Sequence, residues 1–334
     1  MQRRIFLTAL IFAPLANVAL GSKDRRYVVA TASSGGTFHP VGVALSALVQ
    51  AVLQKPYGIS LTAATTAGST QNIRLLKSGE AQFAILQGLI GLDARQGSGA
   101  FSNDGADRTI RALTGLWPNV EQFVVRSEAR KTGTIDDLLA LKGERVALGD
   151  RGSGTLASCR TLLSNLGVEI ERDFELVYIG YGPAGDALQR GDVLAIALPA
   201  GLPTKSLARV KAAMGTDTTI LAFSPDQARR ADGGRNLWLP YTIPADTYPA
   251  QKTEIHTIAQ PNFLAVRGDV PEEDAYLVTR TIFDNLSVLH AMHDATRAIA
   301  LDGALSGLPM PLHPGAIRYF QEKKVAIPEH LMLK

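Results

Sequence analysis

The chain lacks the features that mark a disulfide-stabilised, nucleic-acid-binding or membrane-spanning protein. It has one cysteine among 334 residues, Cys159, so no disulfide can form within it and core packing must hold the fold. Its 34 basic residues are balanced by 31 acidic ones, and no basic run with interleaved aromatic residues occurs, which argues against a nucleic-acid partner. No long apolar run follows the N-terminal segment, so we expect a soluble mature chain.

Signatures of metal and nucleophilic chemistry are also missing. His290 and His293 are spaced for one helix face, yet no carboxylate or HExxH pattern completes a zinc site, so no metal is predicted. The segment 152–155 lacks the lysine of a Walker loop, and no Gly-x-Ser-x-Gly elbow occurs. We therefore assign neither a cofactor nor a catalytic residue, and predict that the protein is not an enzyme.

The N-terminus has the pattern of an export signal. Arg3 and Arg4 precede an apolar run, and small residues follow it up to residue 21. The run is shorter than the ~20 apolar residues of a membrane span and contains Asn17. We expect residues 1–21 to be removed as a signal peptide, leaving a periplasmic protein. The arginine pair leaves both Sec and twin-arginine export open.

One pattern occurs twice along the chain. A Ser-Gly-Gly-Thr segment at residues 34–37 lies between a strand-like and a helix-like segment, and Gly-Ser-Gly-Thr at residues 152–155 does the same. Each is followed by a related helix–turn–strand segment, at residues 75–86 and 187–198. The repetition predicts two similar α/β lobes, each a mainly parallel sheet flanked by helices.

The order of these segments indicates how the lobes divide the chain. We assign residues 22–125 and 256–334 to lobe 1 and residues 126–255 to lobe 2, because a strand predicted over residues 253–266 returns to the first lobe. Crossings near Arg126 and Ile255 would form the hinge, made of two crossing strands. Further local predictions are a surface loop over residues 92–108, a helix capped by Thr134, a polar segment over residues 227–236 and helix over residues 272–300.

Helix starts from both lobes are predicted to face one place. Free backbone N–H groups and the positive end of the helix dipole favour an anion there, and ligands of open α/β sheets bind at the carboxyl ends of strands. We therefore predict a ligand held between the lobes. The candidate ligand-binding residues are Ser34, Gly36, Thr37, Phe38, Ser69, Asn72, Gln87, Ser153, Gly154, Thr155, Tyr181 and Pro199.

Four segments in order resemble the TAXI family, the solute-binding proteins of tripartite ATP-independent periplasmic (TRAP) transporters. They are residues 34–42, 65–81, 141–155 and 311–320. The resemblance implies a type II periplasmic binding protein, a clamshell that closes on a small anionic solute such as glutamate or 2-oxoglutarate. It also implies delivery to an ion-gradient-driven membrane permease, separate or fused, and we expect the binding protein to be a monomer.

The chain departs from this family at two places. Phe38-His39 stands where the family usually has a tyrosine pair, and Gln87 is followed by Gly88-Leu89 where a polar residue is expected. The solute can therefore differ from the familiar ones. His313, within the last of the four segments, is interpreted as structural.

Two other functions stay open from the sequence. A secreted α/β enzyme would use the same helix starts as an oxyanion or phosphate site, and would need a base such as His39 within reach of Ser34 or Ser153. A periplasmic sensor subunit would use the same clamshell. Uptake is favoured, because donors from both lobes would hold a carboxylate without a dedicated arginine.

Overall fold

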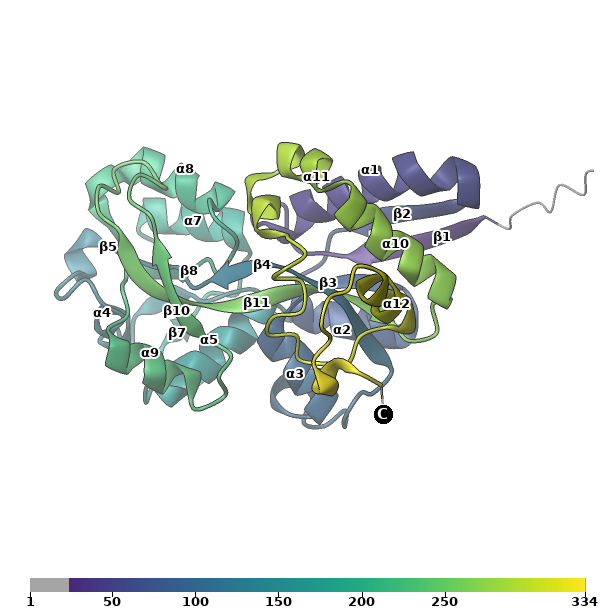
Figure 1. Ribbon diagram of the computed structural model, residues 1–334. Coiled ribbons are helices and arrows are strands. Elements are labelled where there is room, and N and C mark those ends of the chain that lie inside the picture. Colours follow the sequence, from purple (N-terminus) through teal and green to yellow (C-terminus); the bar gives the residue numbers. More distant parts are fainter. Residues whose placement is uncertain (1–23, 334) are drawn as a thin grey trace, which may run out of the picture.

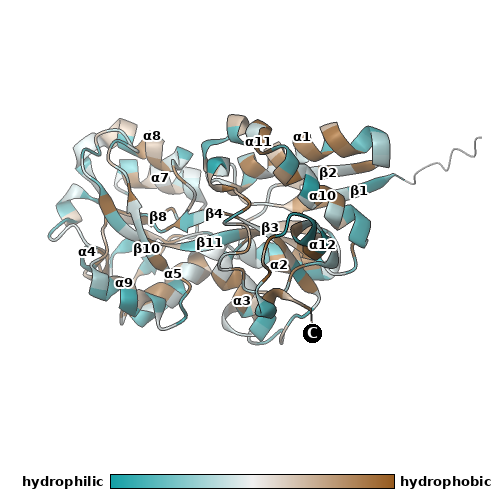
Figure 2. Ribbon diagram, in the orientation of Figure 1, coloured by the Kyte–Doolittle hydropathy of each residue, from teal (hydrophilic) through white to brown (hydrophobic). Residues whose placement is uncertain are grey.

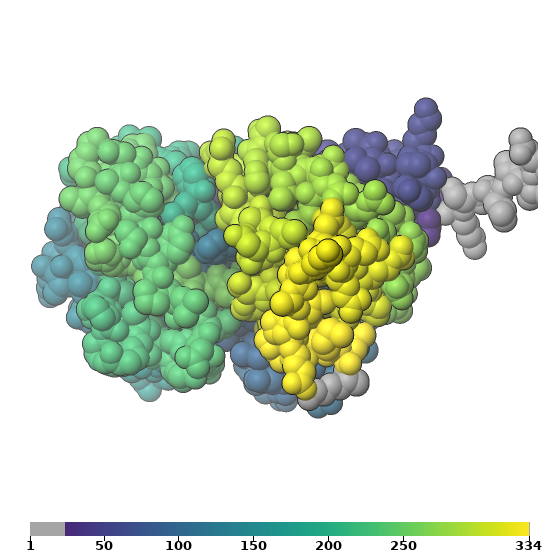
Figure 3. Space-filling view, viewed as in Figure 1, coloured from purple at the N-terminus to yellow at the C-terminus, as the bar shows by residue number. Residues whose placement is uncertain are grey.

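The computed structural model describes residues 24–333 and has two lobes side by side, joined by long strands (Figure 1). The predicted signal peptide lies outside the described residues. Figure 3 shows the same division on the surface, where the middle of the chain forms one lobe and the two ends of the chain form the other. The lobes are therefore not consecutive halves of the sequence.

Lobe 1 is built around one sheet to which the beginning and the end of the chain contribute. Its first elements are β1 (Arg25–Ala30), α1 (Phe38–Tyr57), β2 (Ile59–Ala64), α2 (Ser69–Ser78), β3 (Phe83–Gln87), α3 (Gly88–Gln96), η1 (Gly99–Phe101) and β4 (Ile110–Val120). The chain returns with β11 (Ile255–Arg267), α10 (Glu272–Asp284), α11 (Leu286–Met292), η4 (Asp294–Ala298), α12 (Pro314–Glu322) and η5 (Glu329–Leu331). Strand β10 (Leu239–Ile243) joins this sheet by pairing with the first residues of β11, but it lies on the side of lobe 2 (Figure 1). The strand order is β10-β11-β3-β1-β2, and β4 pairs with β11.

Lobe 2 is built around a second sheet, formed by the middle of the chain. Its elements are β5 (Phe123–Arg126), η2 (Ser127–Ala129), α4 (Asp136–Leu139), β6 (Arg145–Ala147), α5 (Gly154–Asn165), α6 (Ile170–Asp173), β7 (Glu175–Leu176), α7 (Tyr181–Arg190), β8 (Ala195–Ala197), α8 (Lys205–Met214), η3 (Gly215–Asp217), β9 (Thr218–Ile220) and α9 (Pro225–Asp232). The strand order is β7-β6-β8-β5-β9. Helix α7 packs on α8, and α5 packs on α9 (Figure 1).

Both sheets are mixed. Strand β1 is parallel to β2 and β3, and β6 is parallel to β7 and β8, as strand–helix–strand units require. By contrast, β11 is antiparallel to β3, β4 and β10, and β5 is antiparallel to β8 and β9. The expected parallel pairing therefore holds for the strand–helix–strand units and is wrong for the strands that connect the lobes.

Strands β4 and β11 carry the chain between the lobes. They pair antiparallel, with Val120 opposite Ala259 and Ile110 opposite Arg267. The chain has joined the second sheet by Phe123, which pairs with Ala197 of β8. Val120, the last residue of β4, already exchanges backbone hydrogen bonds with Ala200 of lobe 2, so the chain enters lobe 2 at this residue, a few residues before the boundary predicted between residues 125 and 126. Ile255, the other expected crossing, is the first residue of β11.

The repeat in the sequence corresponds to the same helix–turn–strand unit in each lobe. Helix α2 ends at Gly79 with φ 81°, and α7 ends at Gly191 with φ 79°. Glycine adopts this left-handed conformation at little cost, and the N–H of each glycine closes the last helical turn. Each turn leads to a buried strand, β3 or β8.

One local prediction is wrong, and one segment that was predicted only as polar is helical. Thr134 does not cap α4: its hydroxyl lies 2.9 Å from that of Thr132, and the Asp137 carboxylate accepts the N–H groups of Thr132 and Gly133 instead. The polar segment over residues 227–236 is helical up to Asp232, because Ser224 and Gln227 form a reciprocal capping box.

Two further predictions hold only in part. The loop expected over residues 92–108 begins at residue 97, because α3 continues to Gln96. The helical region expected over residues 272–300 is divided at Asn285 into α10 and α11.

Apolar residues fill the interior of both lobes, and the hydropathy of the elements follows their position. In Figure 2, α1 is mostly hydrophobic in colour, whereas α9 at the outer side of lobe 2 is mostly hydrophilic. Cys159 is fully buried in α5, as its leucine neighbours predict. Among the helices of residues 24–333, none combines the length and the apolar composition that crossing a bilayer requires.

Candidate functional site

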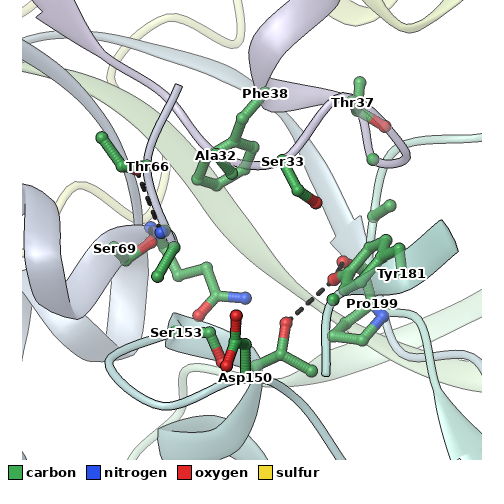
Figure 4. A pocket seen from close by; sticks show the side chains of 18 residues that line it. Ala32, Ser33, Thr37, Phe38, Thr66, Ser69, Asp150, Ser153, Tyr181 and Pro199 are labelled. Atoms are coloured by element: carbon green, nitrogen blue, oxygen red, sulfur yellow. Dashed lines mark hydrogen bonds between the residues drawn. The ribbon is translucent and has the colours of Figure 1, made fainter. Parts of the chain in front are cut away.

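A pocket lies between the lobes where α1, α2, α5 and α7 begin, and it contains about 570 Å³ of empty space, part of it open to solvent (Figure 4). Lobe 1 contributes Ala32, Ser33, Gly36, Thr37, Phe38, Thr66, Ala67, Gly68, Ser69 and Gln87, and lobe 2 contributes Asp150, Ser153, Gly154, Thr155, Gly180, Tyr181, Pro199 and Ala200. Thr37 and Thr155, far apart in sequence, therefore share one cavity. The loops of the two repeats meet here.

Most of the predicted site residues line this pocket, and two do not. Asn72 is fully buried, and its amide nitrogen donates to the carbonyl oxygens of Thr31 at 2.7 Å and Ile85 at 3.0 Å. These bonds hold the end of β1 to β3. We therefore correct the expected role of Asn72 from ligand binding to a structural role. Ser34 is exposed on the loop before α1 and is not among the pocket residues.

Lobe 1 offers hydrogen-bond donors to the pocket. The Ser69 hydroxyl oxygen accepts the backbone N–H of Gln87 at 3.1 Å, which leaves the Ser69 hydrogen free to donate. The side-chain oxygen of Gln87 accepts from the Ser158 hydroxyl of lobe 2 at 3.3 Å, which leaves the Gln87 amide nitrogen as its free end. Both residues are almost fully buried.

The side chains of lobe 2 offer hydrogen-bond acceptors to the pocket. The Tyr181 hydroxyl donates to the carbonyl oxygen of Pro199 at 2.5 Å, so the hydroxyl of Thr155, 2.9 Å away, must donate to the Tyr181 oxygen. The Thr155 hydroxyl can therefore accept a hydrogen bond from a ligand but cannot donate one to it. Burial raises the pKa of Tyr181, which keeps its hydroxyl protonated and this pattern in place.

Helix starts supply backbone donors to the same space. Ser153 caps α5 by accepting the N–H of Leu156 at 3.1 Å, and Gly154 and Thr155 are the first residues of that helix. N–H groups in a first turn have no partner within the helix, so those of Gly154 and Thr155 are available to an anion.

Asp150 is the charged side chain that lines the pocket, and no lysine or arginine of residues 24–333 lines it. Figure 4 shows Asp150 beside Ser153, across the pocket from Phe38 and Ala32. One Asp150 oxygen accepts the N–H of Arg151 at 2.7 Å. An anion would thus be held by hydroxyl, amide and backbone donors. The Asp150 carboxylate would repel any negatively charged group of the ligand that lies close to Asp150.

The lobes are shut around this pocket. On one rim, the carbonyl oxygen of Gly35 accepts from the Ser206 hydroxyl at 3.0 Å, and the Thr37 hydroxyl donates to the carbonyl of Gly201 at 3.2 Å. The Thr37 hydroxyl is therefore used between the lobes.

On the other rim, α2 reaches the loop before α5. The Thr70 hydroxyl donates to the carbonyl of Ser153 at 3.3 Å, and the N–H of Gln71 donates to the carbonyl of Gly152 at 3.0 Å. Bonds on both rims describe a closed arrangement.

Asp150, Ser33 and Thr66 line the pocket but were missed from the sequence. Asp150 and Ser33 follow strands β6 and β1 and precede the two glycine-containing loops, so the carboxyl-end rule could have found them. His39 is not among the pocket residues, and its ring lies 3.1 Å from the Thr31 hydroxyl. No three His, Cys, Asp or Glu side chains of residues 24–333 are grouped to hold a metal ion.

Solved structures of low sequence identity share this architecture. PhnD1 of Prochlorococcus marinus MIT 9301, solved with methylphosphonate, is 14% identical, with 91% of this chain and 100% of that chain covered and a TM-score of 0.55. A protein of Bordetella bronchiseptica RB50 is 12% identical, with 94% and 86% covered and a TM-score of 0.53. A TctC solute-binding protein from Polaromonas is 18% identical over 81% and 86%, with a TM-score of 0.45.

The first two structures support the fold assignment only, because their sequence identities to this chain are too low to indicate a shared function. The architecture is a two-lobed α/β clamshell, as predicted. Membership is shown by a family model that matches residues 29–323, which is most of the chain: the protein belongs to the NMT1-like family.

Proposed function

We propose that the protein captures a small organic anion between its two lobes and delivers it to a membrane permease. The observation that carries the proposal is the pocket itself, where helix starts of both lobes and the side chains of Ser69 and Gln87 direct hydrogen-bond donors to one space between the lobes. Family membership and the clamshell fold support a binding role. The expected signal peptide would place the protein in the periplasm, as a monomer that meets its permease there.

The finer assignment is a TAXI-type subunit of a TRAP transporter that binds glutamate or a similar carboxylate. Between glutamate and 2-oxoglutarate, the hydrogen-bond pattern favours glutamate. A carboxylate matches the donors of Ser69 and Gln87, and an ammonium group matches the acceptors of Asp150 and Thr155. The keto oxygen of 2-oxoglutarate would instead meet the lone pairs of those acceptors.

Closure is the step that transmits binding. A ligand between Ser69 of lobe 1 and Thr155 of lobe 2 touches both sides only when the lobes are shut, so it stabilises the shut form over the open one. Closure also removes water, which strengthens each charge-assisted hydrogen bond. A permease can then distinguish loaded from empty protein by lobe position.

An enzymatic role receives no support from the hydrogen bonds. Within residues 24–333, no hydrogen bond joins His39 to Ser34 or Ser153, and the Ser153 oxygen accepts the N–H of Leu156. A serine nucleophile would need a base in contact with its hydroxyl.

A thermal-shift screen of amino acids, dicarboxylates and other small acids tests the proposal first, because a ligand that binds only the folded protein raises its melting temperature. For the ligand found, we expect Ser153→Ala with Thr155→Val to weaken calorimetric affinity at least about tenfold, since a donor, an acceptor and a helix cap are lost.

The matched control is Thr161→Val with Ser164→Ala, the same two substitutions farther along α5 and away from the pocket. It should leave the affinity unchanged. Equal affinity of all three proteins would reject the role assigned to the start of α5.

A further inference from the structure

A chain of buried polar side chains connects the passage between the lobes with the pocket. Glu121, at this passage, is fully buried, and its Oε1 accepts from Nε1 of Trp238 at 2.9 Å and from Nε2 of Gln260 at 3.4 Å. Gln260 of β11 also donates to the Ser158 hydroxyl at 3.0 Å, and Ser158 donates to Oε1 of Gln87 at 3.3 Å. Of these residues, only Gln87 lines the pocket.

The direction of each bond follows from a backbone donor. The N–H of Leu89 donates to Oε1 of Gln260 at 2.9 Å, so the other end of this amide, Nε2, must be the end that donates to Ser158 and Glu121. The Ser158 oxygen is then an acceptor for Gln260, and its single hydrogen goes to the Gln87 oxygen. The amide nitrogen of Gln87 is left as the end that faces a ligand.

We propose that Glu121 is a positioning residue, which through Gln260 and Ser158 holds Gln87 with its amide nitrogen turned to the bound anion. The chain crosses the lobes, because Ser158 belongs to α5 of lobe 2 and Gln87 to β3 of lobe 1. In the shut arrangement, the bond from Ser158 to Gln87 joins the two lobes. The ligand contact rests on the proposed function, whereas the orientation of Gln87 does not.

The carboxyl group of Glu121 is also placed to gain or lose a proton near neutral pH. Its Oε2 has no hydrogen-bond partner among residues 24–333, and burial raises the pKa of Glu121 to about 7. The titratable groups within electrostatic range are Cys159 of α5 and Tyr181 of α7, whose pKa values are raised by burial first and then by the charge of Glu121. Ionised Glu121 accepts from Gln260 in a charge-assisted bond, and protonation weakens that bond.

The decisive test uses ligand-free protein locked shut. A Cβ atom on Gly35 would lie 2.6 Å from Oγ of Ser206, so we choose Gly35→Cys with Ser206→Cys to form a disulfide across one rim, and loss of the two free thiols verifies that it has formed. In this protein, we expect the NMR signal of the Glu121 carboxyl carbon to titrate near neutral pH. The side-chain amide signal of Gln87 should shift with the same midpoint.

Added Ser158→Ala should abolish the Gln87 shift while Glu121 still titrates. Tyr248→Phe is the matched control, because the Tyr248 hydroxyl donates to Gln122, next to Glu121 but outside the chain of bonds. It should leave the coupled shift intact. A Gln87 signal that ignores the Glu121 titration, or that follows it equally after Ser158→Ala, would overturn the proposal.

Binding of L-glutamate provides a separate readout. We expect Ser158→Ala to weaken it about tenfold and Tyr248→Phe to leave it unchanged. If the unmodified protein binds no carboxylate, the proposed function fails while the NMR experiment still decides the role of Glu121. If it binds and Ser158→Ala has no effect, the positioning role fails and the proposed function stands.

Discussion

The side chains of the two lobes differ in the hydrogen-bonding groups that they offer a ligand, while the backbone N–H groups at the start of α5 add donors on lobe 2. On lobe 1, Ser69 and Gln87 have used their oxygens as acceptors and keep hydrogens to donate. On lobe 2, Thr155 has used its hydrogen on Tyr181, and Asp150 is a carboxylate. We infer that a ligand with a carboxylate at one end and an ammonium group at the other would satisfy both.

Asp150→Asn tests this inference. The change removes the negative charge that would meet an ammonium group, so we expect L-glutamate to bind roughly tenfold more weakly. Binding of 2-oxoglutarate, which lacks the ammonium group, should be unchanged or tighter. Isothermal titration of both compounds against both proteins measures the difference, and equal losses for the two compounds would contradict the assignment of Asp150.

The start of α5 approaches lobe 1 so closely that only a glycine fits at its first position. A Cβ atom on Gly154 would lie 2.9 Å from Cβ of Ser69 and would overlap the Gln87 side-chain amide. Both neighbours belong to the other lobe, so the conflict arises only when the lobes are shut. The missing side chain therefore serves closure rather than the folding of lobe 2.

Gly154→Ala should accordingly weaken ligand binding by at least about tenfold without lowering the free energy of unfolding, because alanine favours a helix more than glycine does. Gly182→Ala is the control: it is also at a helix start, and an added Cβ atom there meets nothing within 4 Å. Titration calorimetry of both variants measures the ligand affinity, and urea unfolding measures the free energy of unfolding. A loss of affinity that is equal in the two would show that closure is not the cause.

Helix α12 is fastened to lobe 1 by His313. This residue is almost fully buried, and its Nδ1 accepts the N–H of Gly315 at 3.2 Å, while its backbone N–H donates to Ala112 of β4 at 2.9 Å. The structural interpretation of His313 is confirmed. Burial lowers the pKa of His313 below its ordinary value.

A lowered pKa makes the contribution of His313 to stability depend on pH. The unfolded chain binds a proton near the ordinary pKa of about 6.5, whereas the folded chain binds it only at lower pH, so stability is present above that value and falls as the pH drops below it. We expect His313→Asn, which keeps a capping oxygen, to reduce the loss between pH 7 and pH 5 by on the order of 1 kcal/mol. Urea unfolding at both pH values measures it; an identical pH dependence in the variant would contradict the assignment.

At the scale of the whole molecule, hydrogen bonds that lie outside the pocket join the two lobes. Ser206 and Thr70 join the lobes at opposite rims, and neither residue lines the pocket. If the lobes open and close as proposed, these bonds would favour the shut form before any ligand arrives. They would then set the fraction of molecules that is ready to bind.

Thr70→Val with Ser206→Ala should therefore shift the unliganded protein toward the open form and weaken ligand binding about tenfold, since two hydrogen bonds of about 1 kcal/mol each are lost. Small-angle scattering should show a larger radius of gyration without ligand and an unchanged one at saturation. The same radius in the unmodified and the double variant without ligand would mean that these bonds do not control the lobes.

Local sequence accounts for a large part of the fold and for part of the pocket. The two Gly/Ser/Thr loops, the paired turns at Gly79 and Gly191, the buried Cys159 and most pocket residues follow from short segments. Such features depend on backbone conformation and apolar spacing within a few residues of each other. The clamshell itself follows from the repetition of one unit and a late returning strand.

Only the tertiary structure decided which way each polar group faces. In the sequence, Asn72 resembles Ser69 as a residue at a helix start. In the structure, its amide nitrogen is hydrogen-bonded to carbonyl oxygens at the ends of β1 and β3 and is not available to a ligand. Glu121, Gln260 and Ser158 are ordinary polar residues in the sequence, and they form a connected chain because β4, β11 and α5 meet at the passage between the lobes. A hydrogen bond commits a donor to one acceptor, and that choice depends on groups brought together from distant parts of the chain.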